Sequence, residues 1–404
     1  MLRKNVRKEC HRGIKMKTAL LIFSMLLVLS ASGAASDASR MTLPSGMDNP
    51  MTIRFPQLAT AVAPPAIEEG LRATYQMITG SPESETRGDI EFVGGDAGVG
   101  LAQVTVVAME AGKAATWTVA FAPDATLGAM KRVNSYGSVN PAGCGDFWCN
   151  PQVLQAIPER SDDDLTVTRG TYELNGKTYN VIRLNFQSNQ GIALGMVYDL
   201  NSGIMLYHTA DYSSSLTTEG GGALTRGQNA ILKLVNLRAV DIPWKDGKLP
   251  GWARPGVVLS YQGSHSFWLP QLPDVAPTVS ALGSELKIHA AHSRYAEGRQ
   301  QTYTEEAMQP PYVPMVSGIA QLMGFWVPEE ALSLQPGAVD YDPDTGMTTS
   351  VMESGPEGVV MEETNGVSYR LTATYDATGK LTGTVTESYT GTASGQKDEL
   401  QLVE

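Results

Sequence analysis

The sequence is poor in the residues and motifs that usually carry catalysis. Its 404 residues include three cysteines and five histidines. It contains no Gly-x-Ser-x-Gly nucleophile elbow, no His-Glu-x-x-His zinc motif and no phosphate-binding P-loop. These absences exclude the enzyme classes that a local motif identifies. They leave open proteins that act by binding, and hydrolases whose catalytic carboxylates lie far apart in the sequence.

The histidines do not suggest a metal site. His11 lies in an N-terminal leader. His289 and His292 are three residues apart in a stretch that we predict to be a strand, where an odd spacing places side chains on opposite faces. The same objection applies to His208 and Asp211. We therefore predict no metal site, and no motif indicates another cofactor.

One acidic segment, Asp340–Gly346, resembles a calcium-binding loop. An EF-hand loop needs Gly at its sixth position and Glu at its twelfth. Here Gly346 is at the seventh position and Val351 at the twelfth, so the pattern fails. Asp is also common in tight turns, where its carboxylate binds backbone amides. We therefore predict that this segment is the turn of a β-hairpin.

Two cysteines remain after the leader, Cys144 and Cys149 in Cys-Gly-Asp-Phe-Trp-Cys. Their spacing differs from the Cys-x-x-Cys of redox enzymes, and no second pair exists for a zinc site. Two close cysteines in an oxidising compartment most simply form a disulfide, which we predict here. Closing so short a loop would stabilise the fold by about 2 kcal/mol.

The N-terminus has the pattern of a secretory signal peptide at residues 1–35. An apolar run, Leu20–Leu29, is followed by the small residues Ser32–Ala35. The basic residues that precede the run are Arg3, Lys4, Arg7, Lys8, Arg12, Lys15 and Lys17. We predict export to the periplasm or the extracellular space. The alternative is an uncleaved anchor that tethers the protein to a membrane, although the apolar core is about half of the ~20 residues that a spanning helix needs.

The chain that remains after cleavage is strongly acidic. It holds 23 Lys and Arg against 41 Asp and Glu, a net charge of −18. Such a surface repels nucleic acid, so we expect no nucleic-acid partner. We also expect no transmembrane span after cleavage, and the sequence does not indicate an oligomeric state.

The chain contains an internal repeat. Arg226–Val235 and Ser394–Val403 share Gly, Gln, Leu, Leu and Val at five of ten aligned positions. Four further matches occur in the same order, among them Gly70–Gln76 with Gly256–Gln262. The offset between matched positions falls from 186 to 168 along the chain. This pattern is typical of a duplication followed by shortening of loops.

The hydrophobic pattern within each repeat has a period of two residues. Short alternating segments are separated by turn sequences such as Asn175-Gly176 and Asn365-Gly366. We predict an all-β protein of two tandem homologous antiparallel units, barrel-like or sandwich-like, with seven or eight strands each. The boundaries we expect are an extended arm at 36–69 with a possible strand over Ile53–Leu58, unit A at 70–240, a linker at 241–255 and unit B at 256–404.

The Phe-Trp segments interrupt this pattern. Asn150 followed by Pro151 suits the start of a helix, and so does Pro328 followed by two acidic residues. We predict a short helix after Trp148 and another after Trp326. These tryptophans, with Trp244 and Trp252 of the linker, are the candidate ligand-binding residues; buried packing is the simpler interpretation, and for the linker pair we expect it between the units.

No resemblance to a known family emerges, so function is predicted from these features alone. We predict a non-catalytic cell-envelope protein that binds a small or lipid-like apolar ligand, or a protein partner of the envelope. One alternative is a structural or surface spacer. The other is an exported hydrolase with carboxylate catalysis, which requires two acidic side chains that face each other across a cleft. No catalytic residue is predicted.

Overall fold

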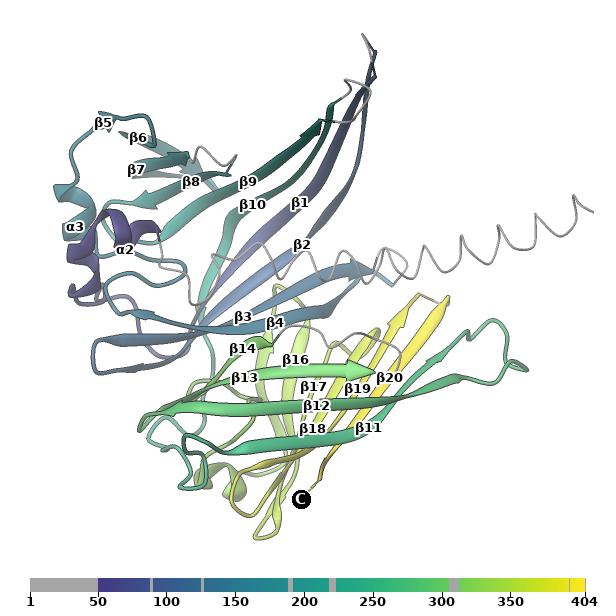
Figure 1. Cartoon of the computed structure of the whole chain (residues 1–404). Helices are drawn as coiled ribbons and strands as arrows, with labels where there is room; N and C mark the ends of the chain where they lie inside the picture. Colours follow the sequence, from purple (N-terminus) through teal and green to yellow (C-terminus); the bar gives the residue numbers. More distant parts are fainter. Residues whose placement is uncertain are drawn as a thin grey trace, which may run out of the picture.

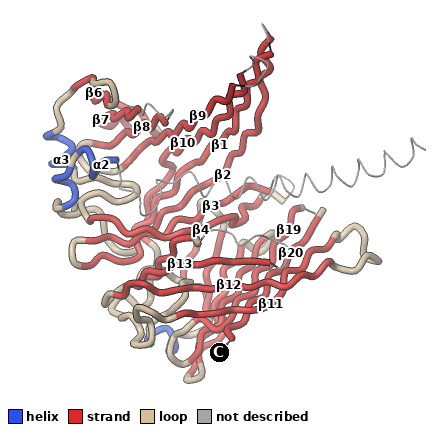
Figure 2. The backbone as a smooth tube through the Cα atoms, viewed as in Figure 1, coloured by secondary structure: helices blue, strands red, loops and turns tan. Residues whose placement is uncertain are grey.

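The computed structural model describes residues 50–87, 90–124, 127–187, 192–217, 223–304, 312–391 and 393–403. The predicted signal peptide, Cys10 and the segment 36–49 lie outside the described residues. The chain forms two ten-stranded antiparallel sheets, one after the other (Figure 1). Helical segments are short and lie mainly at one end of the first unit (Figure 2). The prediction of two tandem antiparallel β units is therefore confirmed.

The first sheet has the strand order β4-β3-β2-β1-β10-β9-β8-β7-β6-β5. The first four strands run outward from β1, and the last six run outward from β10, which pairs with β1. The strands of this sheet are β1 (Leu71–Arg87), β2 (Ile90–Glu110), β3 (Lys113–Asp124), β4 (Ala129–Pro141), β5 (Arg160–Ser161), β6 (Leu165–Leu174), β7 (Lys177–Gln187), β8 (Ile192–Asp199), β9 (Met205–Thr217) and β10 (Ala223–Ala239).

The second sheet repeats this order strand for strand, as β14-β13-β12-β11-β20-β19-β18-β17-β16-β15. Its strands are β11 (Val258–Trp268), β12 (Thr278–Ala291), β13 (Tyr295–Thr304), β14 (Val313–Gly318), β15 (Gly337–Asp342), β16 (Met347–Gly355), β17 (Gly358–Thr364), β18 (Tyr369–Asp376), β19 (Leu381–Thr390) and β20 (Ser394–Val403). The expected count of seven or eight strands per unit is too low. Neither sheet closes into a barrel, because within the described residues the outermost strands of each sheet do not pair with each other.

The Phe-Trp segments make the same contacts in both units. Trp148 forms a β-bridge with Ile204, and Trp326 forms one with Lys380. The backbone N–H of the residue after each tryptophan donates to the carbonyl of a turn glycine, Gly203 in unit A and Gly379 in unit B. Both glycines have positive φ, and a Cβ atom there would lie 2.0 Å from a backbone oxygen, so no other residue fits without a shift. The Phe-Trp segment and the glycine turn are each a weak match between the two repeats in the sequence. In the fold they contact each other in both units.

Short helical segments follow both tryptophans. In unit A the segment is α3 (Pro151–Ala156), where the Asn150 side chain accepts from the N–H groups of Gln152 and Val153 as an N-cap. In unit B it is a 3₁₀ segment, η2 (Glu329–Ser333), and Pro328 is its N-cap rather than its first residue. A helical segment at each Phe-Trp motif is thus confirmed.

The segment before unit A is not a strand. Residues 50–59 form α2 (Pro50–Arg54) and the 3₁₀ turn η1 (Pro56–Ala59). Met51, Phe55 and Leu58 are buried in the core of unit A. The expected strand over Ile53–Leu58 is wrong because the buried positions recur every three to four residues, which is a helical spacing.

The outer face of unit A lies against unit B. Strand β14, one edge of the second sheet, packs on β4, where a Cβ atom at Gly137 would lie 2.3 Å from the backbone nitrogen of Val316. Strand β15, the other edge, meets β1 and β10 through its aspartates. Figure 1 shows β3 and β4 between the bodies of the two units. Unit A therefore covers the opening between the two edges of the unit B sheet, which shields strands that would otherwise be free to pair with other chains.

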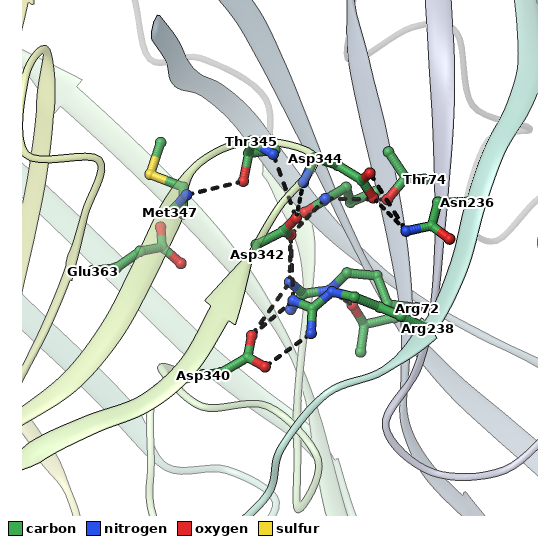
Figure 3. Close-up of polar contacts among 12 residues, drawn as sticks. Arg72, Thr74, Asn236, Arg238, Asp340, Asp342, Asp344, Thr345, Met347 and Glu363 are labelled. Atoms are coloured by element: carbon green, nitrogen blue, oxygen red, sulfur yellow. Dashed lines mark hydrogen bonds and ion pairs between the residues drawn. The ribbon is translucent and has the colours of Figure 1, made fainter.

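Buried ion pairs hold the β15 edge in place (Figure 3). Arg238 binds Asp340 through two hydrogen bonds of 2.8 and 2.7 Å. Arg72 donates to Asp342 at 2.9 Å, and Gln103 donates to the same carboxylate at 2.6 Å. Burial alone would raise the pKa of Asp340, but Arg238 outweighs it and holds the pKa below its ordinary value. The segment Asp340–Gly346 is the predicted hairpin turn, and its aspartates also hold the two units together.

Replacement of Asp340 should destabilise the protein strongly. In Asp340→Asn the Arg238 guanidinium loses its hydrogen-bonded carboxylate and keeps Asp342 at 3.4 Å, so its largely buried charge is poorly compensated, which costs about 3 kcal/mol. Guanidinium unfolding, followed by tryptophan fluorescence, measures this loss. The control Glu399→Gln removes a carboxylate from an exposed pair with Lys397, and should cost about 1 kcal/mol or less. Equal losses in the two variants would contradict the role given to Asp340.

Candidate functional site

Unit A contains a small hollow on the inner face of its sheet. The hollow has a volume of about 60 Å³ and is partly open to solvent. Its lining residues come from seven of the ten strands and one loop: Tyr75, Met77, Ala102, Val104, Thr118, Ala120, Asn134, Tyr136, Asp146, Met196, Tyr198, Met205, His208 and Leu232. Strands β4 and β8 are six places apart in the sheet, yet both line the same hollow. The sheet therefore curves around this space.

One wall of the hollow is apolar. It consists of methionine, alanine, valine, leucine and tyrosine side chains on β1, β2, β8, β9 and β10. Two of its tyrosines are fully buried, and burial raises the pKa of both Tyr75 and Tyr198 well above the ordinary value. The Tyr75 hydroxyl donates to the carbonyl of Met205 at 2.7 Å and ties β1 to β9. Methionine side chains adapt to irregular apolar groups, so this wall suits a small apolar group.

The opposite wall, on β3 and β4, is polar. Asp146 lies in the loop after β4, where its carboxylate accepts hydrogen bonds from Thr116, from Ser138 at 2.5 Å and from Asn140 at 2.8 Å. Tyr136 lies beside it, and burial together with the Asp146 charge raises the pKa of this phenol well above its ordinary value. The hollow is thus amphipathic, with hydrocarbon on one side and hydrogen-bonding groups on the other.

His208 is the unexpected member of the lining. It lies on β9 between Met196 of β8 and Leu232 of β10, and only 4% of its surface is exposed. Its Nδ1 atom has no hydrogen-bond partner among the described residues. Burial in apolar surroundings lowers the pKa of His208 to about 4, although a hydrogen bond to the backbone of Gly195 opposes the shift. The imidazole is therefore neutral at neutral pH.

Sequence reasoning missed this histidine because it considered His208 only as a metal ligand beside Asp211. The alternation of β9 could have placed His208 on the inner face, among the other lining residues. The expectation for His289 and His292 is also incorrect. A register shift at His289 brings both rings to Glu297, at 3.7 and 3.3 Å. Even so, no group of three His, Cys, Asp or Glu in the described part of the chain could hold a metal ion.

The four candidate tryptophans are not among the residues that line the hollow. Three are buried, and their indole N–H groups donate to backbone carbonyls: Trp148 to Ala142, Trp326 to Ser317 and Trp244 to Ile319. Trp252 donates to the carbonyl of Thr378 at 3.0 Å. Both linker tryptophans pack on unit B rather than between the units. A direct role of these side chains in ligand binding remains a prediction.

Unit B has no comparable apolar hollow among the spaces described. A space between unit A and unit B has a volume of about 50 Å³ and is lined from both units. Charged groups dominate it, including Arg72 and Arg132 from unit A and Asp340, Asp342 and Glu363 from unit B. Phe121 of unit A also packs on Met347 and Tyr369 of unit B. The sheet of unit A thus borders an apolar hollow, whereas the sheet of unit B borders a space with charged groups.

Comparisons with known proteins give no family. No family model matches the chain, and no curated protein is similar to it. Among solved structures, MucB in its complex with MucA(peri) is 8% identical with a TM-score of 0.17, over 81% of this chain and 89% of that chain. A DUF1329 family protein from Desulfovibrio piger is 11% identical with a TM-score of 0.12, over 47% and 90%. TM-scores this low carry no argument about function.

A further match is the translocator domain of the autotransporter NalP from Neisseria meningitidis. It is 7% identical with a TM-score of 0.13, over 87% of this chain and 93% of that chain, and it carries no argument either. Within the described residues, no helix has the length and apolar character needed to cross a membrane.

His208 should make the protein less stable in mild acid. The unfolded state binds a proton with a pKa near 6.5, whereas the folded state resists protonation down to about pH 4. Stability is therefore lost as pH falls from 6.5 to 4, by about 3 kcal/mol in total. Urea unfolding from pH 7 to pH 4 should show this loss in the wild type and not in His208→Gln. The exposed control, His289→Gln, should follow the wild type. Parallel curves for wild type and His208→Gln would refute the assignment.

The disulfide remains a prediction that mass spectrometry can test. The Sγ atoms of Cys144 and Cys149 lie 2.9 Å apart, and both residues are buried. In protein purified from an oxidising compartment, alkylation in denaturant should add no label unless a reductant is present. Labelling of both cysteines without reductant would show that the bond is absent.

Proposed function

We propose that this protein is an exported envelope protein that binds a small apolar ligand, or the end of a lipid-like one, in the hollow of unit A. The observation that carries the proposal is the amphipathic hollow, which has buried apolar side chains on one wall and hydrogen-bonding groups on the other. Ligand sites are typically concave and mostly apolar, with a few polar groups that orient the ligand. The basic and apolar leader supports export to the periplasm or the extracellular space.

Unit B has a supporting role in this proposal. Its inner face receives the outer face of unit A, so the two sheets form one body, and the apolar hollow lies in unit A. This arrangement favours ligand binding over a simple spacer, since a spacer gains nothing from an unfilled interior. The hollow itself does not supply the two facing carboxylates that the hydrolase alternative requires. Asp146 is the one acidic side chain in the lining of the hollow, and Asp340 and Asp342 are engaged by arginines.

Filling the hollow should abolish ligand binding. Ala102 lies on the inner face of β2 and is 6% exposed, so Ala102→Trp would place an indole in the hollow. Titration with the neutral fluorescent probe 1-N-phenylnaphthylamine should show saturable binding to the wild type, weakened by tenfold or more in Ala102→Trp, about 1.4 kcal/mol.

The matched control is Val99→Trp, on the outer face of the same strand, where the side chain is 55% exposed. This variant should bind the probe as the wild type does. Native mass spectrometry of the purified protein should in addition show a co-purifying amphiphile. Absence of saturable probe binding to the wild type would overturn the proposal.

A further inference from the structure

The hairpin of β11 and β12 projects from unit B (Figures 1 and 2). Its two strands pair with each other as far as Phe267 and Thr278, whereas the neighbouring strand β13 pairs with β12 only as far as Leu282. The residues that join β11 to β12, 269–277, are all exposed, and none of them lines the hollow of unit A. We call residues 269–279 the hairpin tip.

The hairpin tip is apolar and almost without charge. Its one charged residue is Asp274, and it contains no Lys or Arg. Leu269, Leu272 and Val275 are 37%, 50% and 56% exposed, and Val279 at the start of β12 is 63% exposed. A single exposed aliphatic side chain is ordinary, but a cluster of four on one projecting hairpin indicates a surface that contacts something apolar.

Two successive turns give the tip a defined shape. The N–H of Leu272 donates to the carbonyl of Leu269 at 2.9 Å, and the N–H of Val275 donates to the carbonyl of Leu272 at 2.9 Å. Pro270 and Pro273 occupy the second position of each turn, where the fixed φ of proline suits a β-turn. The three aliphatic residues are therefore the corners of preformed turns, and such a tip loses little conformational entropy on binding.

The side chains change in character from the tip toward the body of unit B. Next to the tip, the rings of Trp268 and Tyr389 meet edge to face, with their centroids 5.8 Å apart. Both residues lie opposite Gly395 of β20, where a Cβ atom would be 2.3 Å from the indole, so glycine makes room for the ring. Three residues before Trp268, the His265 ring bonds to the Asp398 carboxylate at 2.6 Å. The order is thus aliphatic, aromatic and then charged.

We propose that the hairpin tip inserts into the surface of a lipid bilayer whose head groups carry no net negative charge. The order of side chains matches the order of layers at a bilayer surface, which are hydrocarbon, the head-group level where Trp and Tyr gather, and water. Leu272 would then lie among the outer parts of the acyl chains, and Trp268 at the head groups.

Two features favour a neutral membrane over the other possible partners. The tip is a projection that presents its aliphatic side chains outward, which suits a soft lipid surface better than a protein groove that must match it. It also lacks the Lys and Arg that anionic lipids attract, and the chain without its leader has a net charge of −18. The proposal goes beyond the ligand of unit A and does not depend on it.

Flotation with phosphatidylcholine vesicles tests the proposal. The chain from residue 36 onward is used, because the apolar leader would bind lipid by itself. The wild type should float with the vesicles at low and at high ionic strength. In Leu272→Asp the partition coefficient should fall by about tenfold or more, since aspartate is poorly tolerated in hydrocarbon. The matched control is Val258→Asp, at the other end of β11, where the side chain is 48% exposed; it should float as the wild type does.

Quenching by brominated lipids places the tip in the bilayer. Bromine near the head-group end of the acyl chains should quench tryptophan fluorescence more strongly than bromine near the methyl end. Trp268→Phe should remove most of this quenching, because Trp148, Trp244 and Trp326 are fully buried. Vesicles that contain phosphatidylglycerol should bind the wild type more weakly at low ionic strength, since their charge repels the acidic protein.

Four outcomes would overturn the proposal. The first is a wild type that does not float with the vesicles, and the second is equal flotation of wild type and Leu272→Asp. An equal loss in Leu272→Asp and Val258→Asp would show that the tip is not the contact. If the wild type does not float, but gel filtration shows an oligomer that Leu272→Asp converts to a monomer, the tip covers a second copy of the chain instead. Circular dichroism of each variant shows whether it is folded.

Discussion

The structure depends on one constraint, which is that a curved open sheet must cover its inner face and its two edges. In unit B the outer face of unit A does both. Strand β14 packs on β4 around Gly137, and β15 is held by the Arg72 and Arg238 guanidinium groups. In unit A the helical segment around Met51 and Leu58 covers part of the inner face, and the rest remains open as the hollow. The difference between the units follows from which of them acts as the cover.

Much of this fold is visible in the sequence, because strands and hairpin turns are encoded locally. The period of two, the Asn-Gly turns and the ordered internal matches predict two antiparallel units. The Phe-Trp segments also locate the backbone contacts with the turn glycines Gly203 and Gly379. The strand count was underestimated, since long hairpins such as β1–β2 have glycine-rich stretches that obscure alternation. Whether such a sheet closes into a barrel could not be predicted, because closure depends on curvature, which no short stretch specifies.

The candidate site is harder to predict, because it is built from single residues on seven strands. No motif joins His208 to Asp146, and the hollow exists only because the sheet brings β3 and β9 to opposite walls. The role of the β15 aspartates is equally hard to predict from the sequence. Their turn is evident from composition, but their pairing with arginines of unit A depends on how two whole units dock. Such long-range pairing leaves no local trace in a sequence.

The way unit A covers unit B makes two units of like topology unequal. Because one unit acts as the cover of the other, the two cannot exchange places. Each gains a surface that its twin lacks, as Arg238 on one side and Asp340 on the other illustrate. The halves therefore differ where they meet and are alike where each Phe-Trp segment contacts its turn glycine.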